Sequence, residues 1–252
     1  MANSRGEPTP AFRHTKLGGQ SPDGRSIAVT NYYIELDGKP ALPVMGEFHF
    51  SRFPHRYWED ALRAIKAGGI DIVSTYVFWI HHEEREGVFE WSEDLDLRAF
   101  IQACARVGLQ VVVLVGPFAH GECRNGGLPD WLYGRPFTVR STAPDFLAHV
   151  RVLYAAIAKQ LTGLLFKDGG PVIGIQLDNE YMHAGAPWEV TYRQGTEWVP
   201  AGEDGTAYMQ ALKTLALSVG LEVPLYTCTG WIGSPVVEDE MLPVQGGYAF
   251  TP

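Results

Sequence analysis

From about residue 45 onward, short apolar runs alternate with segments whose apolar positions follow helical spacing. The short runs, rich in β-branched residues, lie at 70–79, 109–115, 171–177, 223–227 and 242–245. The segments between them that predict helices lie at 54–67, 95–107, 143–161 and 204–219. Near-continuous apolar strands separated by amphipathic helices are typical of a parallel sheet covered by helices.

The region before residue 45 has a different pattern. Two β-rich runs flank Asp37 and Gly38, a pair that signals the turn of a hairpin. Residues 1–25 are polar and rich in Gly, Ser and Pro, so we expect a flexible N-terminal arm there. Residues 26–252 contain no repeat, linker or low-complexity tract, and we expect them to form one domain.

The alternation predicts an α/β protein with a (β/α)8 TIM-type barrel. Counted from Met45, about six barrel strands are reached by Gln245, whereas a closed barrel has eight. Either the barrel is truncated after about six strands or the count misses two, and we favour truncation. An open barrel exposes two sheet edges, so we expect this chain to be poorly stable or to associate with itself or a partner.

Composition narrows the class of protein. Hydrophobic residues make up 46% of the chain, enough for a large core, and the net charge of −9 comes without any basic run. A nucleic-acid partner is therefore not expected. The N-terminal residues contain no apolar segment of a signal peptide, and no apolar stretch is long enough to cross a membrane. The three widely spaced cysteines indicate a reducing compartment, and we expect a cytoplasmic protein.

Polar and acidic residues gather after the apolar runs, at the strand ends where barrels of this kind hold their chemistry. The sharpest signal is Asn179-Glu180, directly after the apolar run 171–177. A carboxyl group near apolar walls and other acids suits a general acid, and an adjacent Asn can bind a sugar hydroxyl. From spacing alone, a Glu that caps a helix or pairs with an Arg is an equally good interpretation.

Four stretches carry a resemblance to a known family: GEFHFSRFPHRYWEDALRAIKAGGIDIVSTYVFW, HEEREGVFEWSEDLDLRAFI, GPFAHGECRNGGLPDWL and GGPVIGIQLDNEY. In this order and at this spacing they resemble the β-galactosidases of glycoside hydrolase family 35. The resemblance implies a retaining exo-β-galactosidase that works by double displacement and needs no metal or organic cofactor. It runs from about residue 26 to the end of the chain.

The resemblance also assigns roles to residues. Glu180 matches the general acid/base of the family. The expected substrate-binding residues are Tyr76, His120, Gly121, Glu122, Asn179 and Tyr248. At His120 and Gly121 the family often has other small or polar residues, and Tyr248 lies in a less similar run.

A retaining glycosidase also needs a second carboxylate, about 5–5.5 Å from the first, as nucleophile. In the family this Glu follows the seventh strand, so we expect it beyond the end of this chain. Glu238 and Glu240 lie in a polar run that predicts a solvated loop, and Glu222 precedes a strand, at the wrong end of a barrel. The chain alone is therefore expected to be inactive.

Two other functions remain open. A non-catalytic carbohydrate-binding or degenerate barrel would keep the sugar-binding residues and lack the nucleophile. A metal-dependent hydrolase is suggested by four histidines near strand ends, although no strand carries a His-x-His pair and no HExxH motif is present. These four histidines are His49, His81, His120 and His183.

The remaining cysteines and tryptophans support no separate activity. Cys104 and Cys228 are predicted to be core residues. Cys123, next to Glu122, could line the cleft, but nothing in the sequence marks it as a nucleophile. Trp79 and Trp131 are candidates for the wall of the cleft.

Overall fold

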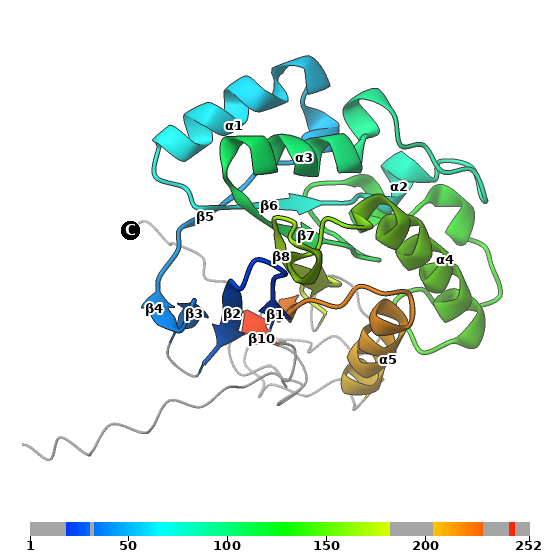
Figure 1. Ribbon diagram of the computed structural model, residues 1–252. Coiled ribbons are helices and arrows are strands. Elements are labelled where there is room, and N and C mark those ends of the chain that lie inside the picture. The colour runs from blue at the N-terminus through cyan, green and yellow to red at the C-terminus, as the bar shows by residue number, and fades with distance from the viewer. Residues whose placement is uncertain (1–18, 31–32, 182–203, 229–241, 245–252) are drawn as a thin grey trace, which may run out of the picture.

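A parallel sheet with helices on one face and a small antiparallel sheet on the other makes up the molecule (Figure 1). The structure, a computed structural model, describes residues 19–30, 33–181, 204–228 and 242–244. Among these residues no helix is both long enough and apolar enough to cross a bilayer.

The large sheet contains six strands, and every neighbouring pair is parallel. Its strands are β5 (Met45–Glu47), β6 (Ile72–Tyr76), β7 (Gln110–Leu114), β8 (Val172–Leu177), β9 (Leu225–Cys228) and β10 (Leu242–Val244). Their order across the sheet is their order along the chain. The fold is therefore a TIM-type α/β barrel of which six strands are described, as the sequence predicted.

Helices connect successive strands of this sheet. They are α1 (Trp58–Ala67), α2 (Trp79–His82), α3 (Leu97–Val107), α4 (Pro144–Leu161) and α5 (Asp204–Ser218). Local sequence explains the limits of α3, because the Asp96 side chain accepts a hydrogen bond from the Ala99 amide at 2.8 Å and Gly108 ends the helix with φ 78°. Helix α4 begins at Pro144, where the missing amide hydrogen costs nothing.

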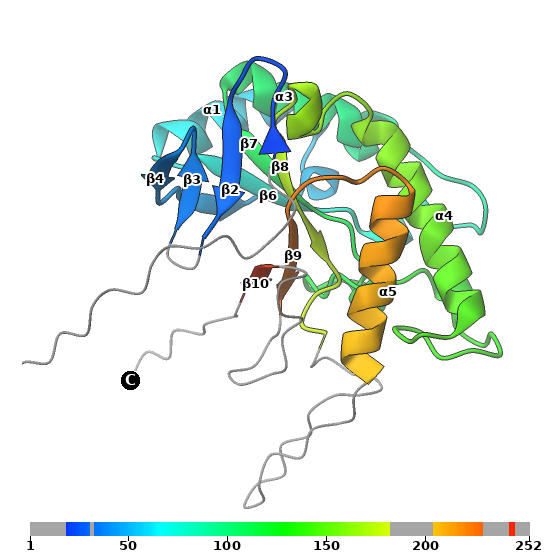
Figure 2. The same ribbon diagram turned by 60° about the horizontal axis from the view of Figure 1, so that its bottom comes forward.

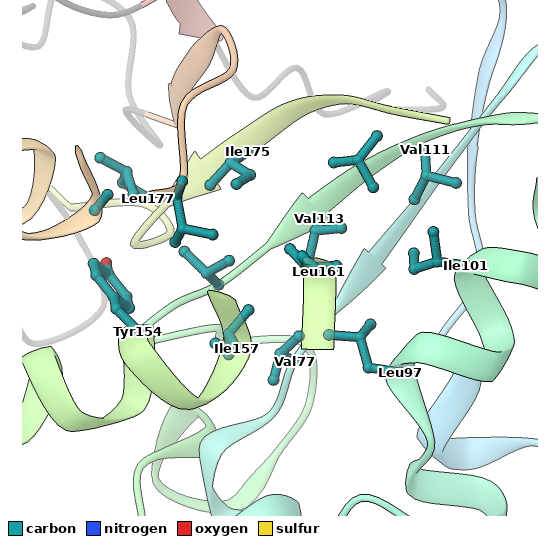
Figure 3. Close-up of a cluster of buried hydrophobic side chains, with 14 of the residues drawn as sticks. Val77, Leu97, Ile101, Val111, Val113, Tyr154, Ile157, Leu161, Ile175 and Leu177 are labelled. Atoms are coloured by element: carbon teal, nitrogen blue, oxygen red, sulfur yellow. The ribbon is translucent and has the colours of Figure 1, made fainter. Parts of the chain in front are cut away.

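Side chains that alternate along the strands build the main core beneath the helices. Val111 and Val113 of β7 and Ile175 of β8 pack against Ile157 and Leu161 of α4, all fully buried (Figure 3). Strand residues of the other parity point to the opposite face of the sheet. The sheet is apolar on both faces, as a buried parallel sheet requires.

The second sheet is antiparallel and covers that opposite face (Figure 2). It consists of β1 (Gly19–Gln20), β2 (Ser26–Val29), β3 (Ile34–Leu36) and β4 (Lys39–Ala41). The predicted hairpin turn is confirmed, since β3 and β4 pair on either side of Asp37 and Gly38. Ile27 of β2 belongs to one apolar cluster with Ile72 and Val112 of the large sheet.

The expected N-terminal arm over 1–25 needs one correction. Strand β1 pairs with β2, and the turn between them is closed by a hydrogen bond from the Ser21 amide to the Arg25 carbonyl at 2.8 Å. Gly19 lies against the Phe166 ring and Arg25 lies over the same ring, 5.4 Å from its centroid. Residues 19–25 are therefore part of the fold, while residues 1–18 lie outside the described part of the chain.

Candidate active site

Asn179 and Glu180 are the second and third residues after β8, at the carboxyl end of the parallel sheet. Both are only 8% exposed. The backbone takes left-handed values on both sides of Asn179, with φ 53° at Asp178 and 46° at Glu180. Residues other than glycine adopt this conformation at a cost, and residues strained in this way cluster at functional sites.

A buried ion pair holds this turn in place. Arg140 donates from Nη2 to Asp178 Oδ1 at 2.6 Å, and the two side chains are 2% and 0% exposed. The same nitrogen also donates to the backbone carbonyl of Asn179 at 3.0 Å, and the Tyr208 hydroxyl donates to Asp178 Oδ2 at 2.8 Å. Both oxygens of the Asp178 carboxylate therefore accept hydrogen bonds from buried side chains, which fixes the backbone of the turn.

The loop after β7 reaches the same turn. His120 Nδ1 lies 3.0 Å from Glu180 Oε2, although the His120 side chain is 47% exposed. The guanidinium of Arg140 lies over the Phe118 ring, 3.9 Å from its centroid, so the loop also contacts the arginine that holds the turn. The structure thus places the predicted residues His120 and Glu180 in direct contact.

Close packing explains why position 121 is a glycine. A Cβ atom at this position would lie 2.8 Å from Phe78 Cε1 and 3.7 Å from Tyr76 Cδ2, and the backbone has φ 49°. Only glycine fits both restrictions without strain. The loop therefore approaches Tyr76 through Gly121.

A cavity of about 620 Å³ opens on the inner face of the parallel sheet. Two of the predicted site residues, Tyr76 and Asn179, line it together with Glu47, Gln176 and Cys228. Asn179 is oriented by Gln176, whose Nε2 donates to its Oδ1 at 3.0 Å. Residues near the carboxyl ends of β5, β6, β8 and β9 therefore line one part of this space, and residues of the antiparallel sheet, among them Val29 and Ile34, line another part.

Tyr76 is a neutral hydroxyl in this cavity. Burial raises the pKa of Tyr76 above its usual value, and the nearby carboxylate of Glu47 raises it further, with a smaller contribution from Glu180. A neutral phenol can both donate and accept a hydrogen bond, which suits a sugar hydroxyl. The His49 ring packs beside the Tyr76 ring, with 5.2 Å between centroids and an angle of 41° between the ring planes, and its Nε2 lies 3.1 Å from Glu47 Oε1.

Glu180, His120 and Gly121 are not among the lining residues described for this cavity, although Glu180 follows Asn179 directly in the chain. The other two predicted residues are not placed at the cavity either. Glu122 is exposed and lines a second pocket with His81 and Cys123 instead. Tyr248 lies outside the described residues.

Sequence reasoning missed Arg140, because it lies in the segment before α4 where no periodic pattern or motif marks it. The expectation for Trp79 was wrong, since it is fully buried in the main core and donates from Nε1 to Glu83 Oε2 at 2.6 Å. Trp131 packs on the same core and donates to the Glu83 carbonyl at 2.8 Å. Both indole nitrogens therefore donate to Glu83, so the two tryptophans have structural roles.

The histidines considered for a metal site lie in different surroundings. His49 contacts Glu47, His81 contacts Ser51 and His120 contacts Glu180. Within the described ranges, no three His, Cys, Asp or Glu side chains gather closely enough to hold a metal ion. His183 lies outside those ranges.

An α/β barrel with an Asn-Glu pair at the carboxyl end of its fourth strand, counted from β5, has the arrangement of a glycoside hydrolase. The sequence profile of the glycosyl hydrolases family 35 matches residues 33–236. This chain belongs to that family.

Individual relatives agree with the family. The chain is 43% identical over 146 residues to a β-galactosidase of Xanthomonas manihotis, which covers 58% of this chain and 24% of the relative. It is 38% identical over 146 residues to the β-galactosidase of Homo sapiens, which covers 58% of this chain and 22% of the relative. The chain therefore spans about a quarter of the length of these curated relatives.

Solved structures confirm the fold. An exo-β-1,4-mannosidase from an Opitutaceae bacterium superimposes with a TM-score of 0.54 at 15% identity, covering 86% of this chain and 34% of that one. A β-galactosidase from a psychrophilic Marinomonas superimposes with a TM-score of 0.50 at 14% identity, covering 74% and 37%. At such low identity these similarities concern the fold alone.

Proposed function

We propose that the protein to which this chain belongs is a retaining exo-β-galactosidase that releases terminal β-galactose. The observation that carries the proposal is the placement of Glu180 beside Asn179 at the carboxyl end of β8, in a chain of family 35. Galactose as the sugar rests on the family and on the named relatives.

In this proposal Glu180 protonates the glycosidic oxygen while a second carboxylate attacks the anomeric carbon. Glu180 then removes a proton from the water that hydrolyses the glycosyl-enzyme. Its low exposure keeps bulk water away from the transferred proton, and His120 holds one of its oxygens.

Asn179 and Tyr76 are proposed to bind sugar hydroxyls from the cavity that they share. The orientation of Asn179 by Gln176 leaves its amide nitrogen as the donor toward the sugar. The Arg140–Asp178 pair does not touch the sugar in this proposal, but it fixes the backbone that carries both Asn179 and Glu180.

The nucleophile is proposed to come from a segment that is not part of this chain. Glu222 precedes β9, at the amino-terminal end of the strands, and its Oε2 lies 3.1 Å from Lys167 Nζ. Glu238 and Glu240 lie outside the described residues. We also propose that the protein works in the reducing cytoplasm, because its three cysteines are odd in number and widely spaced in the sequence.

The test compares substrates with different leaving groups, using the full-length protein that contains this chain. Glu180→Gln is expected to slow hydrolysis of alkyl β-galactosides by about 10²–10⁴-fold, because these leaving groups need a proton. A dinitrophenyl β-galactoside needs no proton, so its cleavage is expected to lose far less. Glu222→Gln, on the opposite end of the barrel, serves as the matched control and is expected to retain full activity.

Equal losses of activity toward both substrates would show that Glu180 is not the general acid.

A carbohydrate-binding barrel without turnover is the second candidate, favoured by the fact that no described carboxylate is assigned as nucleophile. It predicts that the full-length protein binds galactose, with no release of the aglycone from any substrate.

A further inference from the structure

A second pocket, of about 570 Å³, lies apart from the cavity of the proposed active site. Three segments supply its polar side chains: the turn after β5, helix α2 with the residue Glu84 after it, and the loop after β7. The side chains that matter here are Ser51, Arg52, His81, Glu84, Glu122 and Cys123. The pocket combines a thiol, an imidazole and charges of both signs.

The thiol and the imidazole are in contact. Cys123 Sγ lies 4.0 Å from His81 Nε2, and on the other side of the ring His81 Nδ1 lies 3.1 Å from Ser51 Oγ. Cys123 is a free cysteine and is only partly buried. A thiol, an imidazole and a hydroxyl in a row form the arrangement in which a base is oriented by a third group.

His81 is able to act as that base near neutral pH. Burial lowers the pKa of His81, and the positive charge of Arg52 lowers it further, so the ring stays neutral. When Nδ1–H donates to Ser51 Oγ, Nε2 carries the free lone pair that faces the thiol. The ring is also held by its contact with Phe78, at 5.1 Å between centroids.

We propose that Cys123 is a modification site, at which His81 assists the thiol in forming a mixed disulfide with a small disulfide of the peptide type. His81 Nε2 takes the thiol proton, and the thiolate attacks one sulfur of the small disulfide. The new bond forms from Cys123 Sγ to that sulfur while the original S–S bond breaks. The departing thiolate takes the proton from His81, so charge and electrons balance without a further reagent.

The charges around the pocket select the kind of molecule. Arg52 and Arg124 supply positive charge, with Arg124 also paired to Asp130 at 2.8 Å, and Glu84 and Glu122 supply negative charge. A ligand that carries both carboxylate and ammonium groups, as amino-acid and peptide disulfides do, matches both pairs. The pocket volume of about 570 Å³ leaves room for such a molecule beside the Cys123 thiol.

The other two cysteines differ in their surroundings. Cys104 is fully buried on α3, and burial raises the pKa of its thiol to about 12, which keeps it protonated. Cys228 lines the cavity of the proposed active site at the end of β9. Cys104 has no histidine among its described contacts, so it serves as the internal reference for Cys123.

The experiment follows mixed-disulfide formation at each cysteine. The 252-residue chain is incubated near neutral pH with glutathione disulfide, and peptide mass spectrometry gives the rate for each thiol. The urea-unfolded chain provides the rate of mixed-disulfide formation at the same thiol in the absence of the folded pocket. We expect folded Cys123 to react about tenfold faster than unfolded Cys123, and Cys104 to react more slowly when folded.

Two variants distinguish assistance of the Cys123 thiol by His81 from simple solvent exposure of that thiol. His81→Gln is expected to lose most of the tenfold gain, whereas His55→Gln, at an exposed histidine outside the pocket, is expected to keep it. Unchanged circular dichroism shows that His81→Gln remains folded. If Cys123 reacts in His81→Gln as fast as in the wild type, the proposal is overturned. It is also overturned if Cys123 of the wild-type chain reacts no faster when folded than when unfolded, a comparison that needs no variant.

A second disulfide tests the class of ligand. Hydroxyethyl disulfide carries no charge, so the rate ratio of glutathione disulfide to hydroxyethyl disulfide reports on recognition by the pocket. We expect this ratio at Cys123 to be several-fold higher in the folded than in the unfolded chain. An equal ratio overturns the assignment to peptide-type disulfides. The proposal is independent of the proposed hydrolysis, since the reaction is measured on this chain without any glycoside.

Discussion

At the scale of single residues, His82 is a histidine that folding keeps neutral. It is fully buried, its ring stacks on Trp91 at 4.2 Å, and its Nδ1 lies 3.0 Å from the Glu90 carbonyl oxygen. Burial lowers the pKa of His82 to about 4. An unfolded histidine titrates at about 6.5, so the unfolded chain binds a proton between these values that the folded chain does not.

The free energy of unfolding is therefore expected to fall as the pH drops from about 6.5 to about 4, and His82 is expected to account for about 3 kcal/mol of that loss. His82→Phe removes the titrating group and keeps an aromatic ring. Urea unfolding at several pH values measures the difference between variant and wild type. Because only the change of this difference with pH matters, any constant effect of the substitution cancels. A difference that stays constant with pH would contradict the prediction.

The residues of the candidate site that could be predicted from the sequence are those that directly follow a strand. Glu180 and Asn179 could be found from the sequence because an apolar strand runs directly into them. Arg140 could not, since its partner Asp178 is far away in the chain and the pair forms only when the barrel folds. The contact between Cys123 and His81 escaped for the same reason, because it joins the loop after β7 to α2.

At the scale of secondary structure elements, buried parallel strands were the easiest to predict. The expected runs at 109–115 and 171–177 differ from β7 and β8 by one residue at the ends, because burial on both faces leaves a continuous apolar signal. Strand β1 was missed, since its two residues carry no pattern of their own. Its existence depends on contacts with β2 and the Phe166 ring, which a local pattern cannot reveal.

Strand β8 contains a close approach that gives an element-scale prediction. A Cβ atom at Gly174 would lie 2.2 Å from Tyr226 Cε2 of the neighbouring strand β9. Gly174→Ala is therefore expected to destabilise the fold by about 1–3 kcal/mol, because the tyrosine ring must move within a packed interior. Thermal or urea unfolding measures the loss.

The partner substitution provides the control for Gly174. In a Tyr226→Ala background the ring is absent, so adding the methyl group at residue 174 is expected to cost much less than in the wild type. The double-mutant cycle isolates this coupling. If Gly174→Ala costs the same in both backgrounds, the contact with Tyr226 is not the reason for glycine at this position.

At the scale of the whole molecule, the edge of the parallel sheet at β5 is the feature with the largest consequence. Among the described residues β5 pairs with one strand only, β6. Large apolar side chains lie exposed next to this edge, with Leu42 at 85%, Val44 at 52% and Met45 at 52%. Unpaired backbone groups beside exposed apolar side chains favour pairing with another chain.

We therefore expect the 252-residue chain to associate with itself, as the count of barrel strands first indicated. Met45→Lys places a charge on the β5 edge and is expected to weaken the association constant about tenfold. Val152→Lys on the outer face of α4 is the matched control, because Val152 is 51% exposed and lies away from the edge. Sedimentation velocity over a range of concentrations measures both variants. Equal weakening by the two substitutions would show that added charge alone acts, and a wild-type chain that is monomeric at every concentration would contradict the prediction.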